Sequence, residues 1–136
     1  MIEIYADGAC RGNQYKTNIG GYGAVIILND KVIEIKEAFN NVTNNRMEIL
    51  SIIKALEQVK YLGGNVCVYS DSQYVVNTMN LNWRRNANID LWGQLDNLIA
   101  CFSQVNFYKV KGHSNNEFNN RADELANEAM DALDCK

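Results

Sequence analysis

Residues 43–71 read TNNRMEILSIIKALEQVKYLGGNVCVYSD, a helix-like stretch that runs directly into a strand-like one. Apolar residues recur there every three or four positions, which predicts an amphipathic helix; they are Ile49, Ile52, Ile53, Leu56 and Val59. Thr43 is a suitable N-cap, and Gly63-Gly64 marks the end of the helix. Residues 65–71 then predict a short strand. Because a strand reached through a helix is expected to lie parallel to an earlier one, the predicted sheet contains a parallel pair.

The preceding segment supplies the earlier strands. Residues 1–7 alternate apolar and polar side chains with the period of a strand, and Asp7-Gly8 is expected to end that strand. Residues 21–28 and 31–39, joined across Asn29-Asp30, predict a hairpin that pairs with it. The sheet therefore begins antiparallel and becomes mixed.

The second half of the chain adds helices and one more strand. Residues 72–80 and 90–102 are predicted helices, and residues 105–110 a predicted strand. A C-terminal amphipathic helix should cover the sheet; its apolar positions are Ala122, Leu125, Ala126, Ala129, Met130 and Leu133. A chain of 136 residues suits one domain, so we predict a single α/β domain over residues 1–136, with a mixed sheet flanked by helices.

The composition indicates a folded, intracellular protein. Apolar residues make up 47% of the chain and charged residues 21%, which argues against a disordered or fibrous class. The sequence contains no apolar run that could cross a membrane, and its N-terminus lacks the layout of a signal peptide. The four cysteines are far apart and form no C-x-x-C pair, so we expect reduced thiols in place of a zinc site or a disulfide framework.

The net charge argues against one class of function. At −3, with a pI near 5.1, the chain does not have the clustered Lys and Arg that bind nucleic acid by counterion release. This argument weakens if several acidic residues bind cations, because bound metal ions invert the local field where a phosphate would approach.

Four carboxylates stand where such a site would form. Asp7 and Asp71 each follow a strand-like run with matching parity, so a parallel pairing would bring both to the sheet edge where ligands bind. Close carboxylates repel unless one is protonated or a cation lies between them. Glu48 and Asp123 are expected near the starts of helices. Taken singly, Asp7 and Asp71 could simply begin turns. Glu48 and Asp123 could simply interact with the dipoles of their helices. Together they suit Mg²⁺ or Mn²⁺, two of which could drive phosphodiester hydrolysis.

Six blocks of sequence together resemble type I ribonuclease H. In order they are YADGACRGN (residues 5–13), GGYGA (20–24), TNNRME (43–48), SDSQYV (70–75), VKGH (110–113) and NRADELA (120–126). The resemblance spans nearly the whole chain, and TNNRME with SDSQYV is a highly specific combination. It implies the ribonuclease H-like fold, with a five-stranded mixed sheet, and cleavage of the RNA strand of RNA/DNA hybrids with two Mg²⁺ ions, or with Mn²⁺.

The resemblance also implies roles for the acidic residues. Asp7 would be shared by both ions, and Asp123 would bind the ion that activates the attacking water. Glu48 and Asp71 would bind the ion at the leaving group. His113 would be the loop histidine that assists proton transfer or product release; standing alone, it would be an ordinary exposed loop residue.

Further residues are candidates for binding the hybrid. Side-chain amides that could read 2′-hydroxyls and groove edges come from Asn13, Asn44, Asn45 and Gln73. Thr43 and Arg46 stand where a helix N-terminus could hold a DNA phosphate, although Arg46 could equally be a helix-surface residue. Trp83, beside Arg84 and Arg85, could lie along the DNA strand or pack partly buried, whereas Trp92 is expected in the core.

Two departures from the family pattern and two alternatives bear on function. The loop at residues 12–21 is longer than the family's compact form, and the basic protrusion expected between residues 76 and 90 is reduced. We therefore predict weak, salt-sensitive binding of the hybrid. We also expect the chain to be a monomeric, free-standing catalytic domain.

A non-catalytic hybrid-binding domain is one alternative, disfavoured because all four acids are present. A DNA-directed relative such as a resolvase or transposase is the other, disfavoured by the amides suited to 2′-hydroxyls.

Overall fold

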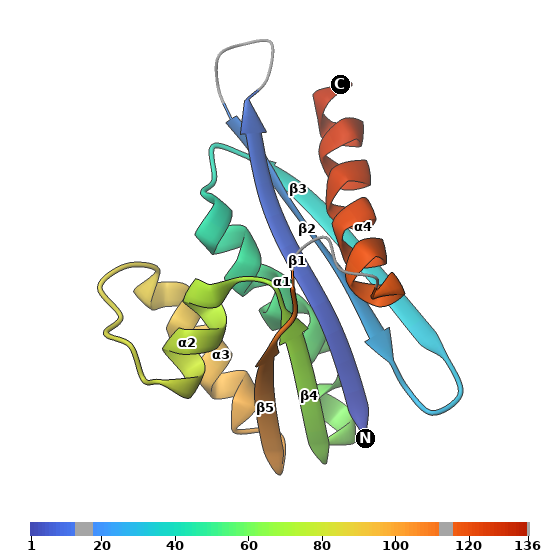
Figure 1. Ribbon diagram of the computed structural model, residues 1–136, viewed down its shortest axis with the longest axis vertical. Coiled ribbons are helices and arrows are strands. Elements are labelled where there is room, and N and C mark those ends of the chain that lie inside the picture. Colours follow the sequence, from blue (N-terminus) through green and yellow to red (C-terminus); the bar gives the residue numbers. More distant parts are fainter. Residues whose placement is uncertain (13–17, 112–115, 136) are drawn as a thin grey trace.

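The computed structural model describes residues 1–12, 18–111 and 116–135, which form one five-stranded sheet with helices on both faces (Figure 1). The strands are β1 (Ile2–Gly12), β2 (Asn18–Ile27), β3 (Val32–Asn40), β4 (Asn65–Ser70) and β5 (Gln104–Lys109). The helices are α1 (Asn44–Val59), the short 3-10 helix η1 (Lys60–Leu62), α2 (Gln73–Asn80), α3 (Ile89–Ile99) and α4 (Glu117–Asp134).

The strand order is β3-β2-β1-β4-β5, and the sheet is mixed as predicted. β2 pairs antiparallel with both β1 and β3, whereas β4 pairs parallel with β1 and with β5. The crossover helix α1 thus returns the chain to the other side of β1, which makes β1 the central strand. The predicted hairpin and the predicted parallel strand are both confirmed.

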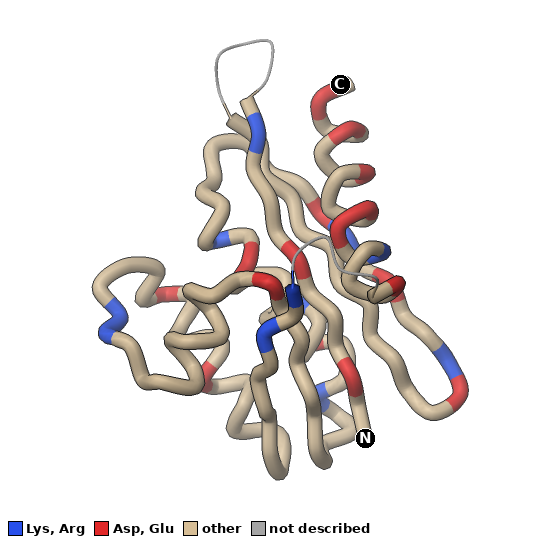
Figure 2. Tube along the Cα trace, viewed as in Figure 1, with Lys and Arg blue, Asp and Glu red and all other residues tan. Residues whose placement is uncertain are grey.

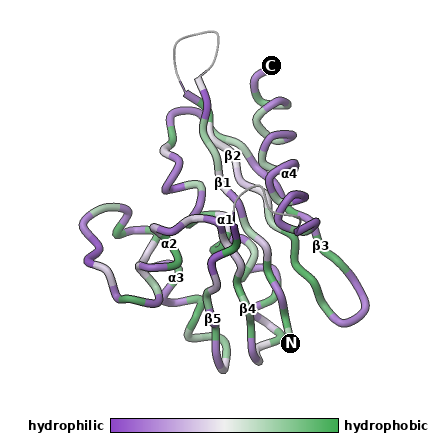
Figure 3. Tube along the Cα trace, viewed as in Figure 1, coloured by the Kyte–Doolittle hydropathy of each residue, from purple (hydrophilic) through white to green (hydrophobic). Residues whose placement is uncertain are grey.

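Two layers of helices cover the two faces of the sheet. Alternate residues of β1 enter different cores: Ile4 packs in the larger core with α1 and α3, and Tyr5 packs in the smaller one with α4. Trp92 is 1% exposed in the larger core, which confirms its predicted place. Charged residues are spread over strands, helices and connections and are frequent along α4 (Figure 2), whereas hydrophobic residues concentrate in the strands (Figure 3).

One predicted boundary was wrong. The strand expected to end at Asp7-Gly8 continues to Gly12, because β1 stays paired with β2 as far as Gly12 opposite Asn18. Its parallel pairing with β4 does stop early, at Ala6 opposite Ser70. Asp7 is therefore inside a strand on one side and just beyond the last pair on the other.

Side-chain caps explain where α1 and α2 begin. Thr43 caps α1 as predicted, its Oγ1 accepting a hydrogen bond from the backbone N–H of Arg46 at 3.2 Å. The Ser72 hydroxyl accepts from Val75 in the same way at the start of α2. Cap hydrogen bonds of this kind satisfy backbone donors that have no partner within the helix.

The structure also tests the predictions about the cysteines and about membrane-spanning segments. All four cysteines are free, as expected from their spacing. Among the described helices, none combines the length and the apolar character needed to cross a bilayer.

Candidate active site

Three carboxylates from different elements meet at the end of the parallel pairing. Asp7 of β1, Glu48 of α1 and Asp71, which follows β4, each offer an oxygen, and these oxygens lie within 4.8 Å of one another. Asp7 and Glu48 are each 5% exposed, and Asp71 is partly buried. The sequence prediction that Asp7 and Asp71 share one edge is thus matched by the geometry.

Gly8 explains how Glu48 reaches this cluster. A Cβ atom at Gly8 would lie 2.4 Å from both the backbone nitrogen of Glu48 and the carbonyl carbon of Met47, so α1 approaches β1 as closely as a glycine allows. The Gly8 N–H donates a hydrogen bond to the Glu48 carboxylate. The other oxygen, Oε2, is buried without a hydrogen-bond partner in the described structure.

The three clustered carboxylates can be accommodated together only if a bound cation or protons neutralise their charge. Burial, together with the nearby carboxylates of Glu48, Asp71 and Asp123, raises the pKa of Asp7 to about 10. Burial also raises the pKa of Glu48 well above its usual range, and the Gly8 hydrogen bond opposes this shift. Buried negative charges this close are costly unless neutralised. An all-oxygen donor set with an unpartnered buried oxygen fits a hard divalent cation.

Asp71 is held by the connection between β4 and α2. The carbonyl of Ser70 accepts a hydrogen bond from Val110 N–H at 2.9 Å, and the Ser70 hydroxyl accepts one from Ser72 N–H at 3.1 Å. Ser70 is fully buried. The backbone on both sides of Asp71 is therefore fixed by hydrogen bonds, which orients its carboxylate toward the cluster.

Asp123 stands apart from the three clustered acids. It is exposed on α4, but lies close enough to Asp7 to raise the pKa of that carboxyl. α4 is set against β2 at Gly23, where a Cβ atom would lie 2.3 Å from the carbonyl oxygen of Ala122. Its outer side is tied to β3 by Arg121, which pairs with Glu34 at 2.8 Å.

The predicted substrate residues fall at two helix starts. Thr43, Asn44 and Asn45 are exposed at the beginning of α1, and Gln73 is exposed at the beginning of α2. These two helices follow the same edge of the sheet that carries the carboxylate cluster. Asn13 and His113 lie outside the described residues.

Arg46 and Trp83, two further candidates for binding the hybrid, differ in their surroundings. Arg46 makes two hydrogen bonds to Asp90, at 2.8 and 3.0 Å, and a third to Asn88 at 3.2 Å. These contacts favour the alternative in which Arg46 is a helix-surface residue, because they link α1 to α3. Trp83 is 43% exposed between α2 and α3.

The neighbouring arginines differ in the same way. Arg85 pairs with Asp96 at 2.6 Å and lies 5.2 Å above the Trp92 ring, whereas Arg84 is exposed. The segment between α2 and α3 therefore presents little free positive charge.

Sequence reasoning missed the residues that position the site. Gly8 was interpreted as a turn residue, and Gly23 was given no role of its own. The signal that could have identified Gly8 is its place directly after a candidate metal ligand in a β-rich run, where a missing side chain indicates a close approach. The ion pair of Arg121 joins residues 87 positions apart, and no local pattern predicts it.

Comparisons with known proteins identify the family. The family model described as RNase H matches residues 1–131. The ribonuclease H of Clostridium botulinum (strain Hall) is 46% identical over 144 residues, covering 96% of this chain and 95% of that protein. That of Chlorobium phaeobacteroides (strain BS1) is 43% identical over 143 residues, covering 95% and 94%.

Solved structures are similar as well. The N-terminal RNase H domain of a Mycobacterium tuberculosis protein matches with a TM-score of 0.80 and 33% identity, over 96% of this chain and 94% of that one. LC11-RNase H1, solved in complex with an RNA/DNA hybrid, matches with a TM-score of 0.81 and 27% identity, over 98% and 99%.

Proposed function

Since the chain belongs to the ribonuclease H family and is an endoribonuclease acting on the RNA strand of RNA/DNA hybrids, we propose that the three clustered carboxylates, together with Asp123, bind its catalytic metal ions. The observation that carries this proposal is the buried group of Asp7, Glu48 and Asp71, whose oxygens lie within 4.8 Å of one another. Mg²⁺ is the proposed ion, with Mn²⁺ as the alternative, because both favour carboxylate oxygens.

Each carboxylate has a distinct task in the proposal. Asp7, which is close enough to Glu48, Asp71 and Asp123 for each of them to raise its pKa, would be shared by two ions. Glu48 and Asp71 would hold the ion next to the leaving group, and Asp123 would hold the ion next to the attacking water. When bound, the ions supply an activated water and neutralise charge on the leaving oxygen. The protein's own contribution is to hold the acids in place through Gly8 and Ser70.

The hybrid is proposed to lie across the starts of α1 and α2. The side chains of Asn44, Asn45 and Gln73 are exposed there and can donate to or accept from the 2′-hydroxyls of the RNA strand. Thr43 and the first backbone N–H groups of α1 suit a DNA phosphate. Asn13 is proposed as a further amide contact, Trp83 as a contact along the DNA strand, and His113 as the group that transfers a proton or promotes product release.

We further propose that residues 1–136 act as one monomeric catalytic domain with modest affinity for the hybrid. The scarcity of free positive charge between α2 and α3 supports this affinity. Light scattering should give a mass near 15.4 kDa. The dissociation constant for a hybrid should rise steeply between about 50 and 200 mM salt. Nanomolar affinity at physiological salt would contradict the proposal.

The test of activity is cleavage of an end-labelled RNA/DNA hybrid with Mg²⁺, Mn²⁺ or EDTA. Duplex DNA and duplex RNA are tested in parallel as control substrates, and Asp71→Asn is the matched inactive variant. Metal-dependent cuts in the hybrid's RNA alone, lost in Asp71→Asn, are expected. No cutting by a folded protein at low salt would favour the non-catalytic binding domain, and cutting of plain duplex DNA would favour a DNA-directed nuclease.

A further inference from the structure

A row of aromatic rings crosses the sheet on the face that also carries α4. Phe118 of α4 lies 5.4 Å from Tyr5 of β1, measured between ring centroids. Tyr5 stacks on Tyr69 of β4 at 4.7 Å, and Tyr69 stacks on Tyr108 of β5 at 5.5 Å. The register of the parallel strands produces this row, because Tyr5, Tyr69 and Tyr108 stand directly opposite one another. We call these four residues the aromatic row.

The aromatic row leads from the carboxylate site to the edge of the sheet. Tyr5 is two residues before Asp7, and it is 8% exposed. At the other end Tyr108 is 46% exposed, on the edge strand β5. Two strand spacings of about 4.8 Å separate them, so the exposed ring lies roughly 10 Å from the strand that carries Asp7. One face of Tyr108 is stacked on Tyr69, and the opposite face has no aromatic partner in the described structure.

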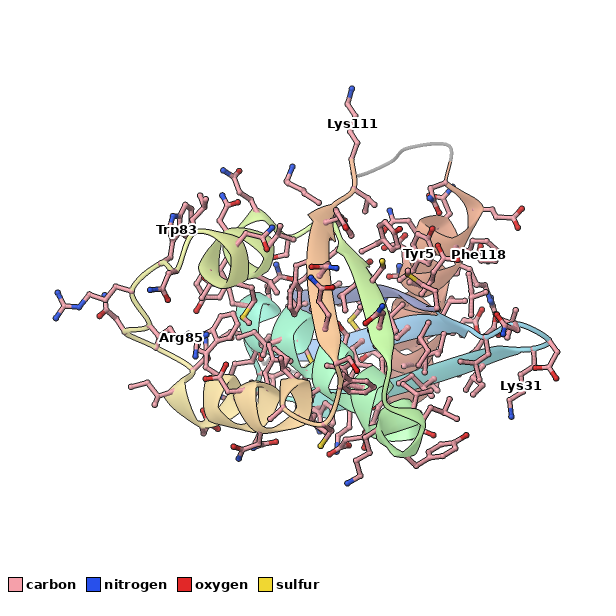
Figure 4. The ribbon with its side chains drawn as sticks, turned by 90° about the horizontal axis from the view of Figure 1, so that it is seen from below. Tyr5, Lys31, Trp83, Arg85, Lys111 and Phe118 are labelled. Atoms are coloured by element: carbon pink, nitrogen blue, oxygen red, sulfur yellow. The ribbon has the colours of Figure 1, made fainter. Side chains whose placement is uncertain are left out.

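Positive charge accompanies the exposed end of the row. Lys111 is exposed just after β5, where Figure 2 shows basic positions, and it forms no ion pair within the described residues. Lys109 is also exposed, but it alternates with Tyr108 along β5 and therefore faces the other side of the sheet, with Phe107. Figure 4 shows Lys111 on the same side of the sheet as Tyr5 and Phe118, away from α1 and α3. By contrast, most other cations of the described chain are paired, namely Arg11, Lys36, Arg46, Lys54, Arg85 and Arg121.

We propose that Tyr108, with Lys111, binds a single-stranded extension of the hybrid that occupies the carboxylate site. An unpaired base can stack on an open aromatic face, whereas bases inside a duplex already stack on their neighbours. Lys111 suits a phosphate next to such a base. The inference rests on the proposed function, because the position of the extension follows from the hybrid being held at Asp7 and its partners.

The experiment compares a blunt hybrid with the same hybrid carrying a short single-stranded extension. Affinity is measured by fluorescence anisotropy in the Asp71→Asn background, which prevents cleavage. The extension should tighten binding by about fivefold or more, the effect of one stacked base. Tyr108→Ala should bring the ratio of the two affinities close to one, and Tyr108→Phe should preserve it because the ring remains. Tyr61→Ala is the matched control, since Tyr61 is 71% exposed on η1, outside the row.

Two results would overturn the inference. Equal affinities for the blunt and extended hybrids would leave Tyr108 without a nucleic-acid role and would direct attention to a peptide pairing along the open edge of β5. An equal loss of both affinities in Tyr108→Ala would show that the ring contacts the duplex. Failure of the proposed function is distinguishable, because it would appear as no cleavage of the blunt hybrid by the unmodified chain.

Discussion

Glu48 and Asp123 lie on helices that cover opposite faces of the same sheet, and they are held in very different ways. Glu48 is buried, its helix rests on the backbone of Gly8, and a backbone N–H fixes one carboxylate oxygen. Asp123 is exposed on a helix that contacts β2 at Gly23 and is tied to β3 by surface ion pairs. Core packing thus organises the Glu48 side in advance, whereas salt can weaken the contacts on the Asp123 side.

Neutralising each acid should separate the two sides most clearly. Glu48→Gln should slow cleavage by about 100-fold or more, because metal neutralisation is worth several kcal/mol. The same change should raise the melting temperature of the metal-free protein, since it removes a buried charge beside Asp71. Asp123→Asn should also slow cleavage but leave the melting temperature unchanged. Equal shifts in melting temperature for the two variants would contradict the contrast.

The close approach at Gly8 offers the next largest effect. Gly8→Ala should destabilise the fold by about 1–3 kcal/mol, because the new methyl group meets backbone atoms of α1 that cannot move independently. Displacement of Glu48 should reduce cleavage by roughly tenfold to 100-fold. Gly12→Ala is the control, since a Cβ atom there meets nothing within 4 Å. Urea unfolding and hybrid cleavage would measure both; an undisturbed Gly8→Ala variant would refute the packing argument.

Loosening α4 should have a smaller effect that depends on salt. Arg121→Ala removes the contacts to Glu34 and Glu128, so cleavage should fall by less than about tenfold, and only at low salt. In high salt the variant and the unmodified protein should behave alike. Lys60→Ala, which removes an exposed charge without an ion pair in the described structure, should have no such effect. A loss that persists in high salt would show that packing, not charge, secures α4.

The smallest expected effect concerns the link between α1 and α3. Hydrogen bonds from Arg46 lower the pKa of Asp90 to about 2, from an ordinary value of 3.8. Because the folded-state pKa is depressed, the stabilisation is fully present above pH 3.8 and is lost as the pH falls toward 2. The stability difference between the unmodified chain and Asp90→Asn should therefore be constant from pH 7 to about 5, shrink as the pH falls toward 2, and vanish only below the folded-state pKa. Urea unfolding across this range would show a flat difference if the pair were inert.

Much of this arrangement could be predicted from local pattern. Alternation over residues 1–7 and the helical period after Thr43 indicated the crossover, and the crossover placed Asp7 beside Asp71. The continuation of β1 past Gly8 could not be predicted, because Asp-Gly favours a turn locally and only pairing with β2 overrides it. The ion pair between Arg46 and Asp90 depends on how α3 packs against α1, and the sequence of neither helix predicts that packing by itself.

The unequal pairing of β1 has a consequence for the motions of the enzyme. Beyond Ala6 the strand remains paired with β2 on one side, so Asp7 should share the slow hydrogen exchange of the sheet centre. Asp71 lies outside regular structure between β4 and α2, and its backbone is held only through the hydrogen bonds of its neighbours Ser70 and Ser72, so it should open on a faster timescale than β1. Fluctuations in the spacing of these two carboxylates therefore arise from the α2 side alone. We therefore expect the position of Asp7 to stay fixed during the catalytic cycle. The backbone at Asp71 and the start of α2 should be the part of the site that adjusts when the substrate binds.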